Sequence, residues 1–208
     1  CFDYVVDADK DYTSLCEYST DSFLINVGNQ GDRANTYSLS VEGPNWVNLE
    51  KTTLTLNPGE SGSANVLLAP DYNVVGDFDI NFKAVSEKGN IMAIKLLKVN
   101  VRKCHGVIVD LVEDSGKVCN SFSTSFPVII RNNGEVKEKY NLKLEGPEWS
   151  SLDENVVEIN PGEDKEITLS IAPLADVPLG KYNTKVIAES FDGRIRSEDQ
   201  ISVSNILR

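Results

Sequence analysis

The stretch that decides the fold is NQGDRANTYSLSVEGPNWVNLEKTTLTLNPGESGSANVLLAP, residues 29–70. Its distinctive residues recur, in the same order and at a constant offset, in residues 132–173. In the first copy they are Asn29, Gly31, Tyr37, Leu39, Gly43, Pro44, Trp46, Leu49, Asn57, Pro58, Gly59, Glu60, Ala69 and Pro70. A period held this strictly indicates two copies of one unit. We therefore expect two domains, over residues 1–103 and 104–208.

Apolar residues alternate with polar ones within each copy, a spacing typical of half-buried strands. The pattern is clear at Phe23, Ile25 and Val27, and it returns over residues 126–130. No stretch has helical spacing. We expect about seven strands in each copy, over residues 2–8, 20–28, 35–42, 52–56, 62–69, 76–86 and 91–102 in the first. Short strands separated by regular turns predict an all-β chain of two tandem immunoglobulin-like β-sandwich domains.

The last strand of the first copy breaks the alternation. Met92, Ile94 and Leu96 form one apolar series, and a second series begins at Leu97 and continues to Val101. Two adjacent leucines in a strand predict a β-bulge or a change of sheet at this point.

The repeated turn and core residues resemble a known family. Asn-x-Gly, Tyr-x-Leu, Gly-Pro-x-Trp, Pro-Gly-Glu and Ala-Pro, followed by Gly180-Lys181-Tyr182 in the second copy, are similar to the α-galactosidase-associated Ig-like family. They also resemble the related cell-adhesion-type repeats of archaeal and bacterial surface proteins. The archaeal arrays often carry Cys-Pro-Gly-Glu, and this chain departs from that at Cys16-Glu17 and Cys119-Asn120. The resemblance implies secreted, tandem, non-catalytic modules.

The four cysteines fall at repeat-related positions, since Cys1 and Cys16 match Cys104 and Cys119. Repeat symmetry favours the pairs Cys1–Cys16 and Cys104–Cys119. A strand of about seven residues, however, holds its ends roughly 23 Å apart, whereas a disulfide needs Cα atoms within about 7 Å. The first and last strands of domain 1 should end at the same pole, which favours Cys16–Cys104. Both pairings stay open, and either one indicates an oxidising, extracellular setting.

The second pairing leaves Cys119 in need of a partner near position 208, where Arg208 stands. We therefore hypothesise that the chain is two repeats of a longer array, or that subunits join head to tail through Cys119 and Cys1. Cys1 has an alternative interpretation as the lipidated residue of a lipoprotein.

The sequence predicts no enzyme. The only histidine, His105, has no counterpart in the first copy, where Phe2 stands. No nucleophile motif, zinc motif or phosphate loop is present. A catalytic centre is therefore not expected.

Two sets of residues are candidate binding sites. Asp7, Asp9 and Asp11 alternate in a way that can offer oxygens to calcium, although the glycine and closing glutamate of a calcium loop are missing; no other cofactor is expected. Trp46 and Trp149 follow the Gly-Pro turns and are interpreted as lids over the core. The alternative for these tryptophans is carbohydrate stacking.

The net charge of −12 argues against nucleic acid or anionic lipid as a partner. No apolar run reaches the ~20 residues of a membrane-spanning helix. The sequence therefore predicts a non-catalytic extracellular structural or adhesive module of a cell-surface or filament-forming repeat protein, whose partners are other surface or filament subunits. The alternative function is an accessory carbohydrate-binding module of a secreted glycosidase.

Overall fold

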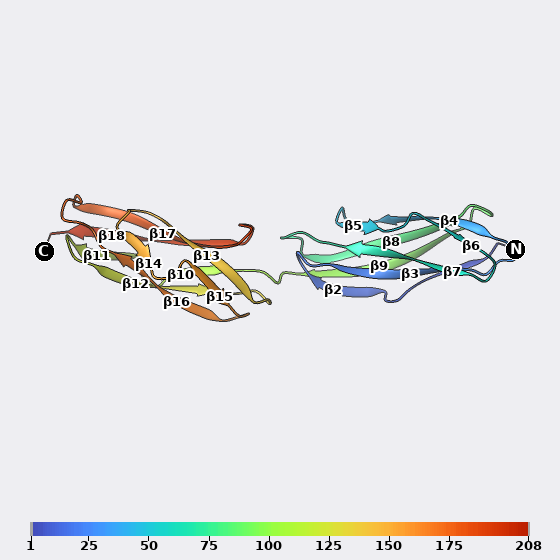
Figure 1. The fold of residues 1–208 in the computed structure, drawn as a ribbon, viewed down its shortest axis with the longest axis horizontal. Coiled ribbons are helices and arrows are strands. Elements are labelled where there is room, and N and C mark those ends of the chain that lie inside the picture. The colour runs from blue at the N-terminus through green and yellow to red at the C-terminus, as the bar shows by residue number, and fades with distance from the viewer. Residues whose placement is uncertain (1, 208) are drawn as a thin grey trace. The chain divides into compact units, whose positions relative to one another are not determined.

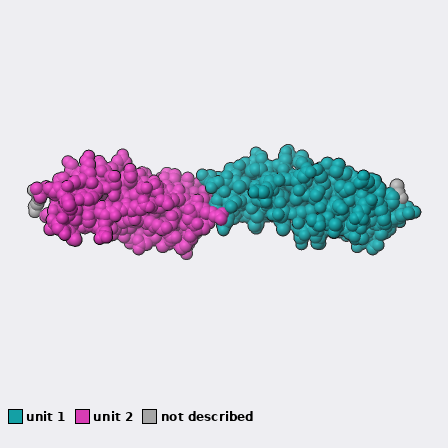
Figure 2. Space-filling model, turned by 90° about the horizontal axis from the view of Figure 1, so that it is seen from above, with its two compact units in different colours: residues 1–103 teal, residues 104–208 magenta. Residues whose placement is uncertain are grey.

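The computed structural model describes residues 2–207, and it divides into two compact units, Cys1–Lys103 (unit 1) and Cys104–Arg208 (unit 2). Figure 2 colours the two units separately. Every regular element within the described residues is a β-strand, as the alternating pattern predicts. The chain is thus an all-β protein of two immunoglobulin-like sandwiches. Within residues 2–207, no helix is long and apolar enough to cross a membrane.

Unit 1 contains two facing sheets (Figure 1). The strands are β1 (Tyr4–Ala8), β2 (Tyr12–Cys16), β3 (Asp21–Asn29), β4 (Asn35–Glu42), β5 (Val47–Leu49), β6 (Thr53–Leu56), β7 (Ser61–Leu68), β8 (Gly76–Ser86) and β9 (Met92–Arg102). One sheet has the order β1-β3-β7-β5, and the other has the order β2-β9-β8-β4-β6.

Unit 2 repeats this topology strand for strand. Its strands are β10 (Ile108–Leu111), β11 (Ser115–Cys119), β12 (Thr124–Arg131), β13 (Glu138–Glu145), β14 (Ser150–Leu152), β15 (Val156–Ile159), β16 (Asp164–Ile171), β17 (Gly180–Ser190) and β18 (Arg196–Ile206). The sheet orders are β10-β12-β16-β14 and β11-β18-β17-β13-β15.

The prediction of two all-β sandwiches is confirmed, but the expected count of about seven strands per copy is too low, because residues 2–207 form nine strands in each unit. In unit 1 the two missed strands are β2 and β5. The inward positions of β2 are Thr13 and Leu15, so a buried threonine hides the apolar alternation. β5 is only three residues long, which is too short to show a period.

The predicted bulge in the last strand of unit 1 is also wrong. β8 and β9 pair without interruption from Gly76 opposite Val101 to Val85 opposite Met92. The adjacent leucines simply lie on opposite faces of one flat strand, because side chains alternate sides. Leu97 is fully buried in the core, whereas 47% of Leu96 is exposed.

Each unit has its own hydrophobic core between its two sheets. Strands from both layers contribute the largest buried side chains. In unit 1 these include Tyr37, Phe23, Phe82, Ile25 and Leu97, and in unit 2 they include Tyr140, Ile130, Ile167 and Leu169. Burial of such side chains on both inner faces is what holds a sandwich together.

Candidate functional site

The end of the β2–β9 pair holds a disulfide. β2 runs parallel to β9, with Cys16 opposite Arg102. The Glu17 N–H donates to the Arg102 carbonyl at 2.9 Å, so the pairing continues just past the strand end. Cys104 follows two residues after Arg102, and Cys16 and Cys104 are joined in a disulfide.

The disulfide decides between the two predicted pairings. Because Cys16 is bonded to Cys104, the symmetric pairing of Cys1 with Cys16 and of Cys104 with Cys119 is wrong. The physical reason is the parallel pairing of β2, the second strand, with β9, the last strand of the unit, which brings their C-terminal ends together. Cys1 lies outside the described residues.

Unit 2 has the same backbone pairing at this strand end but no disulfide at Cys119. β11 runs parallel to β18, with Cys119 opposite Ile206. The Asn120 N–H donates to the Ile206 carbonyl at 2.9 Å, as Glu17 does to its partner in unit 1. Cys119 is a free, half-buried thiol. It therefore occupies the position of a bonded cysteine without a bond of its own.

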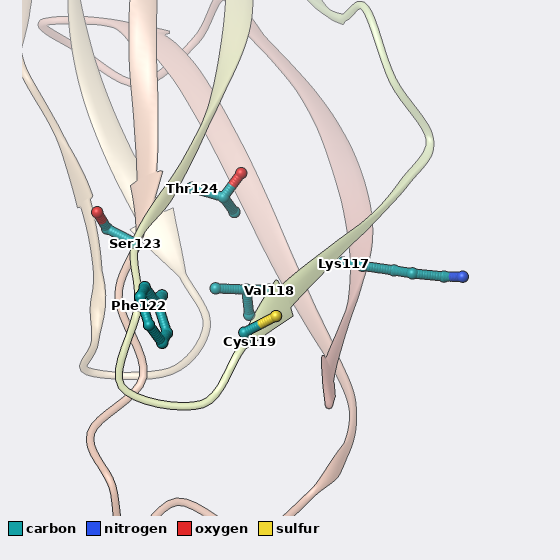
Figure 3. Close-up of a pocket in the computed structure, with 6 residues that line it drawn as sticks. All are labelled: Lys117, Val118, Cys119, Phe122, Ser123 and Thr124. Carbon is teal, nitrogen blue, oxygen red and sulfur yellow. The ribbon is translucent and has the colours of Figure 1, made fainter. Parts of the chain in front are cut away.

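The thiol borders an open pocket of about 320 Å³. Figure 3 shows its lining, which is Lys117, Val118, Cys119, Phe122, Ser123 and Thr124. Ser121 has a left-handed backbone (φ 65°), and the turn is closed by the Phe122 N–H, which donates to the Cys119 carbonyl at 3.0 Å, so that both side chains line the pocket. Lys117 extends away from the sulfur in the same view. The pocket thus presents a thiol and an aromatic ring together at the end of the unit.

Sequence reasoning predicted Cys119 but missed Phe122. The repeat held a signal, since Ser19 stands at the matching place in unit 1. Unit 2 thus has a half-exposed phenylalanine where unit 1 has a serine. This aromatic ring lines the same pocket as Cys119, the one free thiol of the described residues, so the two strand ends differ in chemistry.

The three predicted calcium ligands do not converge on one point. Asp7 and Asp11 both bind the Lys95 ammonium, with N–O distances of 3.3 and 2.9 Å. Asp9 instead accepts the backbone N–H of Leu24 at 2.9 Å. The Lys95 ammonium therefore already contacts two of the carboxylates that a calcium ion would need as ligands. Calcium binding here stays a prediction that rests on the sequence pattern alone.

The two tryptophans differ in burial. Trp46 is 9% exposed and packs edge-on against Phe78, with ring centroids 5.1 Å apart. Trp149 makes the same kind of contact with Tyr182 at 5.0 Å but is only half-buried. It lines an open pocket of about 420 Å³ that also includes Leu174. The lid interpretation therefore describes Trp46 well, whereas Trp149 packs on the core and also borders an open pocket.

The single histidine is part of a partly buried polar cluster at the start of unit 2. His105 Nδ1 lies 3.1 Å from a carboxylate oxygen of Glu138. The neighbouring Tyr140 hydroxyl donates to the Gly106 carbonyl at 2.8 Å. Burial, together with the charge of Glu138, raises the pKa of Tyr140. These contacts hold the residues that precede β10 against β13.

The fold and this strand-end site define a tandem immunoglobulin-like module with a free thiol at the end of β11. No family model matches the chain, and no curated protein matches it. Among solved structures it is similar to a protein of unknown function from Porphyromonas gingivalis W83, at 14% identity over 97% of this chain and 99% of that one, with a TM-score of 0.38.

Two further similar structures come from proteins with printed activities or domain names. One is CBD12 from CALX1.2, at 11% identity over 97% and 99% of the two chains, with a TM-score of 0.39. The other is the endo-fucoidan hydrolase MfFcnA4 of glycoside hydrolase family 107, at 13% identity and a TM-score of 0.40. The match covers 99% of this chain but only 29% of that hydrolase. Likeness at this level carries no argument about function.

Proposed function

We propose that this chain is a non-catalytic extracellular structural module, part of a cell-surface or filament-forming repeat protein, whose units are joined head to tail through Cys119. The observation that carries the proposal is the pair of equivalent strand ends. In unit 1, Cys16 is bonded to Cys104, the first residue of the next unit. In unit 2, the equivalent Cys119 is a free thiol. A cysteine that begins another such unit, of which Cys1 is an example, is the matching partner.

The chemistry of this link is an ordinary thiol oxidation. The two thiols lose two protons and two electrons and form one S–S bond, while an oxidant such as oxidised glutathione is reduced to two thiols. Disulfides persist in oxidising compartments, so the proposal includes an extracellular location. The resemblance to secreted surface repeats supports the same location.

Re-oxidation of the purified chain tests the proposal. The protein is fully reduced, oxidised in a glutathione buffer and separated on a non-reducing gel. We expect a ladder of covalent multimers that collapses to monomer on reduction. Cys119→Ser should leave monomers carrying only the internal disulfide, and Cys1→Ser should do the same. Exclusively monomeric product from the unaltered chain, with Cys119 still reactive toward a thiol reagent, would overturn the proposal.

A second candidate function is carbohydrate binding, because Trp149 is only partly buried and lines an open pocket. Aromatic faces stack on apolar sugar faces in the same way that they pack on other flat apolar surfaces. Titration with a panel of oligosaccharides, followed through Trp149 fluorescence in a Trp46→Phe variant, tests this function. A saturable change that Trp149→Ala removes would support an accessory binding module; a flat titration would reject it.

A further inference from the structure

One stretch of unit 1 is an unpaired sheet edge. β9 pairs with β8 along Met92–Val101, but β2 covers only the part of β9 from Lys98 to Arg102. Among residues 2–207, no other strand pairs with β9 on the β2 side. The segment Met92–Leu96, called the open edge below, therefore has its outer backbone groups unpaired within the unit. Such an edge is a template for another strand.

The direction of the backbone groups follows from two hydrogen bonds at the covered end. The Lys98 N–H donates to the Asp11 carbonyl at 2.9 Å, and the Arg102 carbonyl accepts from the Glu17 N–H at 2.9 Å. Both residues of β9 therefore point their backbone groups toward β2. Since these groups alternate sides along a strand, every second residue counted back from Lys98 does the same.

The open edge thus presents the backbone N–H and C=O of Met92, Ile94 and Leu96. Their side chains all lie on the outer face of the sheet and are 58%, 54% and 47% exposed. An apolar outward row of this kind is unusual, because exposed edges are commonly protected by charge or by short length. The charged side chain of the open edge, Lys95, lies on the inner face and is paired with Asp7 and Asp11.

The matching edge of unit 2 has that protection. β18 pairs with β11 only from Ser202 onward, so its first residues form the equivalent edge. Arg196, Glu198 and Gln200 stand there in place of the apolar row. The two units share topology and register, so the difference lies in the side chains alone.

We propose that the open edge of unit 1 pairs, as an antiparallel strand, with the open edge of a second copy of this chain. A two-fold axis at Ile94 places Ile94 opposite its own copy and Met92 opposite Leu96. All three positions are then hydrogen-bonded pairs, since such pairs recur at every second residue. The cross-strand pairs among these three positions, on the outer face, are apolar, whereas on the inner face Ala93 stands opposite Lys95.

Length and charge both favour a second copy as the occupant. Opposite Lys98, where β2 begins, the partner chain has reached Asn90, a left-handed turn residue (φ 49°) at which its own β8–β9 hairpin turns away. The paired length therefore matches the open length, and no like charges stand directly opposite each other in this register. The same two-fold pairing of β18 would place Glu198 opposite its copy, and like charges directly opposite are destabilising.

Sedimentation of a Cys119→Ser chain tests this inference without interference from the proposed head-to-tail disulfide. A contact of three residue pairs is small, so the dimer is expected only at concentrations of roughly 0.1–1 mM. Ile94→Glu should weaken the dimer at least tenfold. Gln200→Glu, which adds the same charge to the equivalent edge of unit 2, should leave the dimer unchanged. Far-ultraviolet circular dichroism checks that both variants keep the fold.

Mixing two variants of opposite charge at Ile94 tests the pairing most sharply. Ile94→Glu and Ile94→Lys should each be monomeric alone and should form a dimer when mixed, because opposite charges then face each other across the two-fold axis. Amide exchange at Met92, Ile94 and Leu96 should slow on dimerisation. A monomeric unaltered edge at ~1 mM, equal effects of Ile94→Glu and Gln200→Glu, or a mixture that stays monomeric would each overturn the inference. None of these results affects the covalent ladder expected from Cys119.

Discussion

Cys16 is bonded to Cys104, although the internal repeat makes Cys104 the equivalent of Cys1. The disulfide thus ties the end of β2 to Cys104, two residues after β9, and encloses strands β3 to β9 of unit 1 in one covalent loop. Unit 2 has the same strand ends but a free thiol, Cys119. The two units therefore share a fold and differ in how that fold is closed.

Removal of this disulfide should destabilise unit 1. Cross-linking a loop of nearly 90 residues contributes about 4 to 5 kcal/mol in the chain-entropy model. The double variant Cys16→Ser/Cys104→Ser should therefore lose about that much free energy of unfolding in urea denaturation. Cys119→Ser, the matched control, should unfold like the unaltered chain. A loss of less than about 1 kcal/mol in the double variant would contradict a closing role for the disulfide.

The Asn-x-Gly motif is expected to matter through one buried side chain. The Asn29 amide donates to the carbonyls of Arg33 and Leu56 at 2.9 and 3.0 Å, and its oxygen accepts from the Gly31 N–H at 3.0 Å. Asn29→Ala leaves these backbone groups without their partner and should cost about 2 to 4 kcal/mol.

Thermal and urea unfolding measure this cost. Asn45→Ala removes an exposed asparagine of the same unit and should change stability by less than about 0.5 kcal/mol. Equal stability of the two variants would mean that the motif is a turn signal without energetic weight.

Asp21 should make the stability of unit 1 depend on pH. Partial burial alone would raise its pKa, but hydrogen bonds from Lys10, Thr13 and the Ser22 backbone hold the pKa of Asp21 below its ordinary value of 3.8. The folded state thus favours the ionised form. Its stabilisation is present above the unfolded pKa and is lost as the pH falls through the lower folded pKa.

The difference in unfolding free energy between the unaltered chain and Asp21→Asn should therefore shrink as the pH is lowered from about 6 to about 2. Glu60→Gln, an exposed carboxylate in the turn before β7, provides a comparison on the same unit. If the gap between the unaltered chain and Asp21→Asn stayed constant over this range, the ion pair with Lys10 would carry no linkage to folding.

The burial of the two tryptophans predicts different fluorescence. A Trp149→Phe variant reports Trp46, which should emit at shorter wavelength and resist acrylamide quenching because it lies in the core. A Trp46→Phe variant reports the half-buried Trp149, which should be quenched several-fold more strongly. Similar quenching of both variants would contradict the difference in packing.

The duplicated turns and alternating strands were sufficient to predict the sandwiches, because burial of one face of each strand imposes a period of two. Strand β2 shows where the alternation of apolar residues fails to predict a strand. One of its two inward positions is Thr13, a buried polar residue whose hydroxyl donates a hydrogen bond to Asp21, so this position does not contribute to the apolar pattern. Tertiary hydrogen bonding, which the pattern does not encode, decides that strand.

The bulge expected at Leu96 and Leu97 fails for the opposite reason. Apolar residues were taken to face the core, whereas Met92, Ile94 and Leu96 face outward on an unpaired edge. The candidate site was predicted in part: repeat arithmetic indicated that Cys119 lacks a partner, but the aromatic neighbour Phe122 depends on the local turn at Ser121.

Mapping of the disulfides in an oxidised mixture of isotope-labelled and unlabelled chains tests the account most directly. Non-reduced proteolytic fragments are identified by mass spectrometry. The account predicts Cys16–Cys104 fragments with both halves from one chain, and Cys1–Cys119 fragments that combine labelled and unlabelled halves. Fragments that join Cys104 to Cys119, or multimers without mixed Cys1–Cys119 fragments, would contradict it.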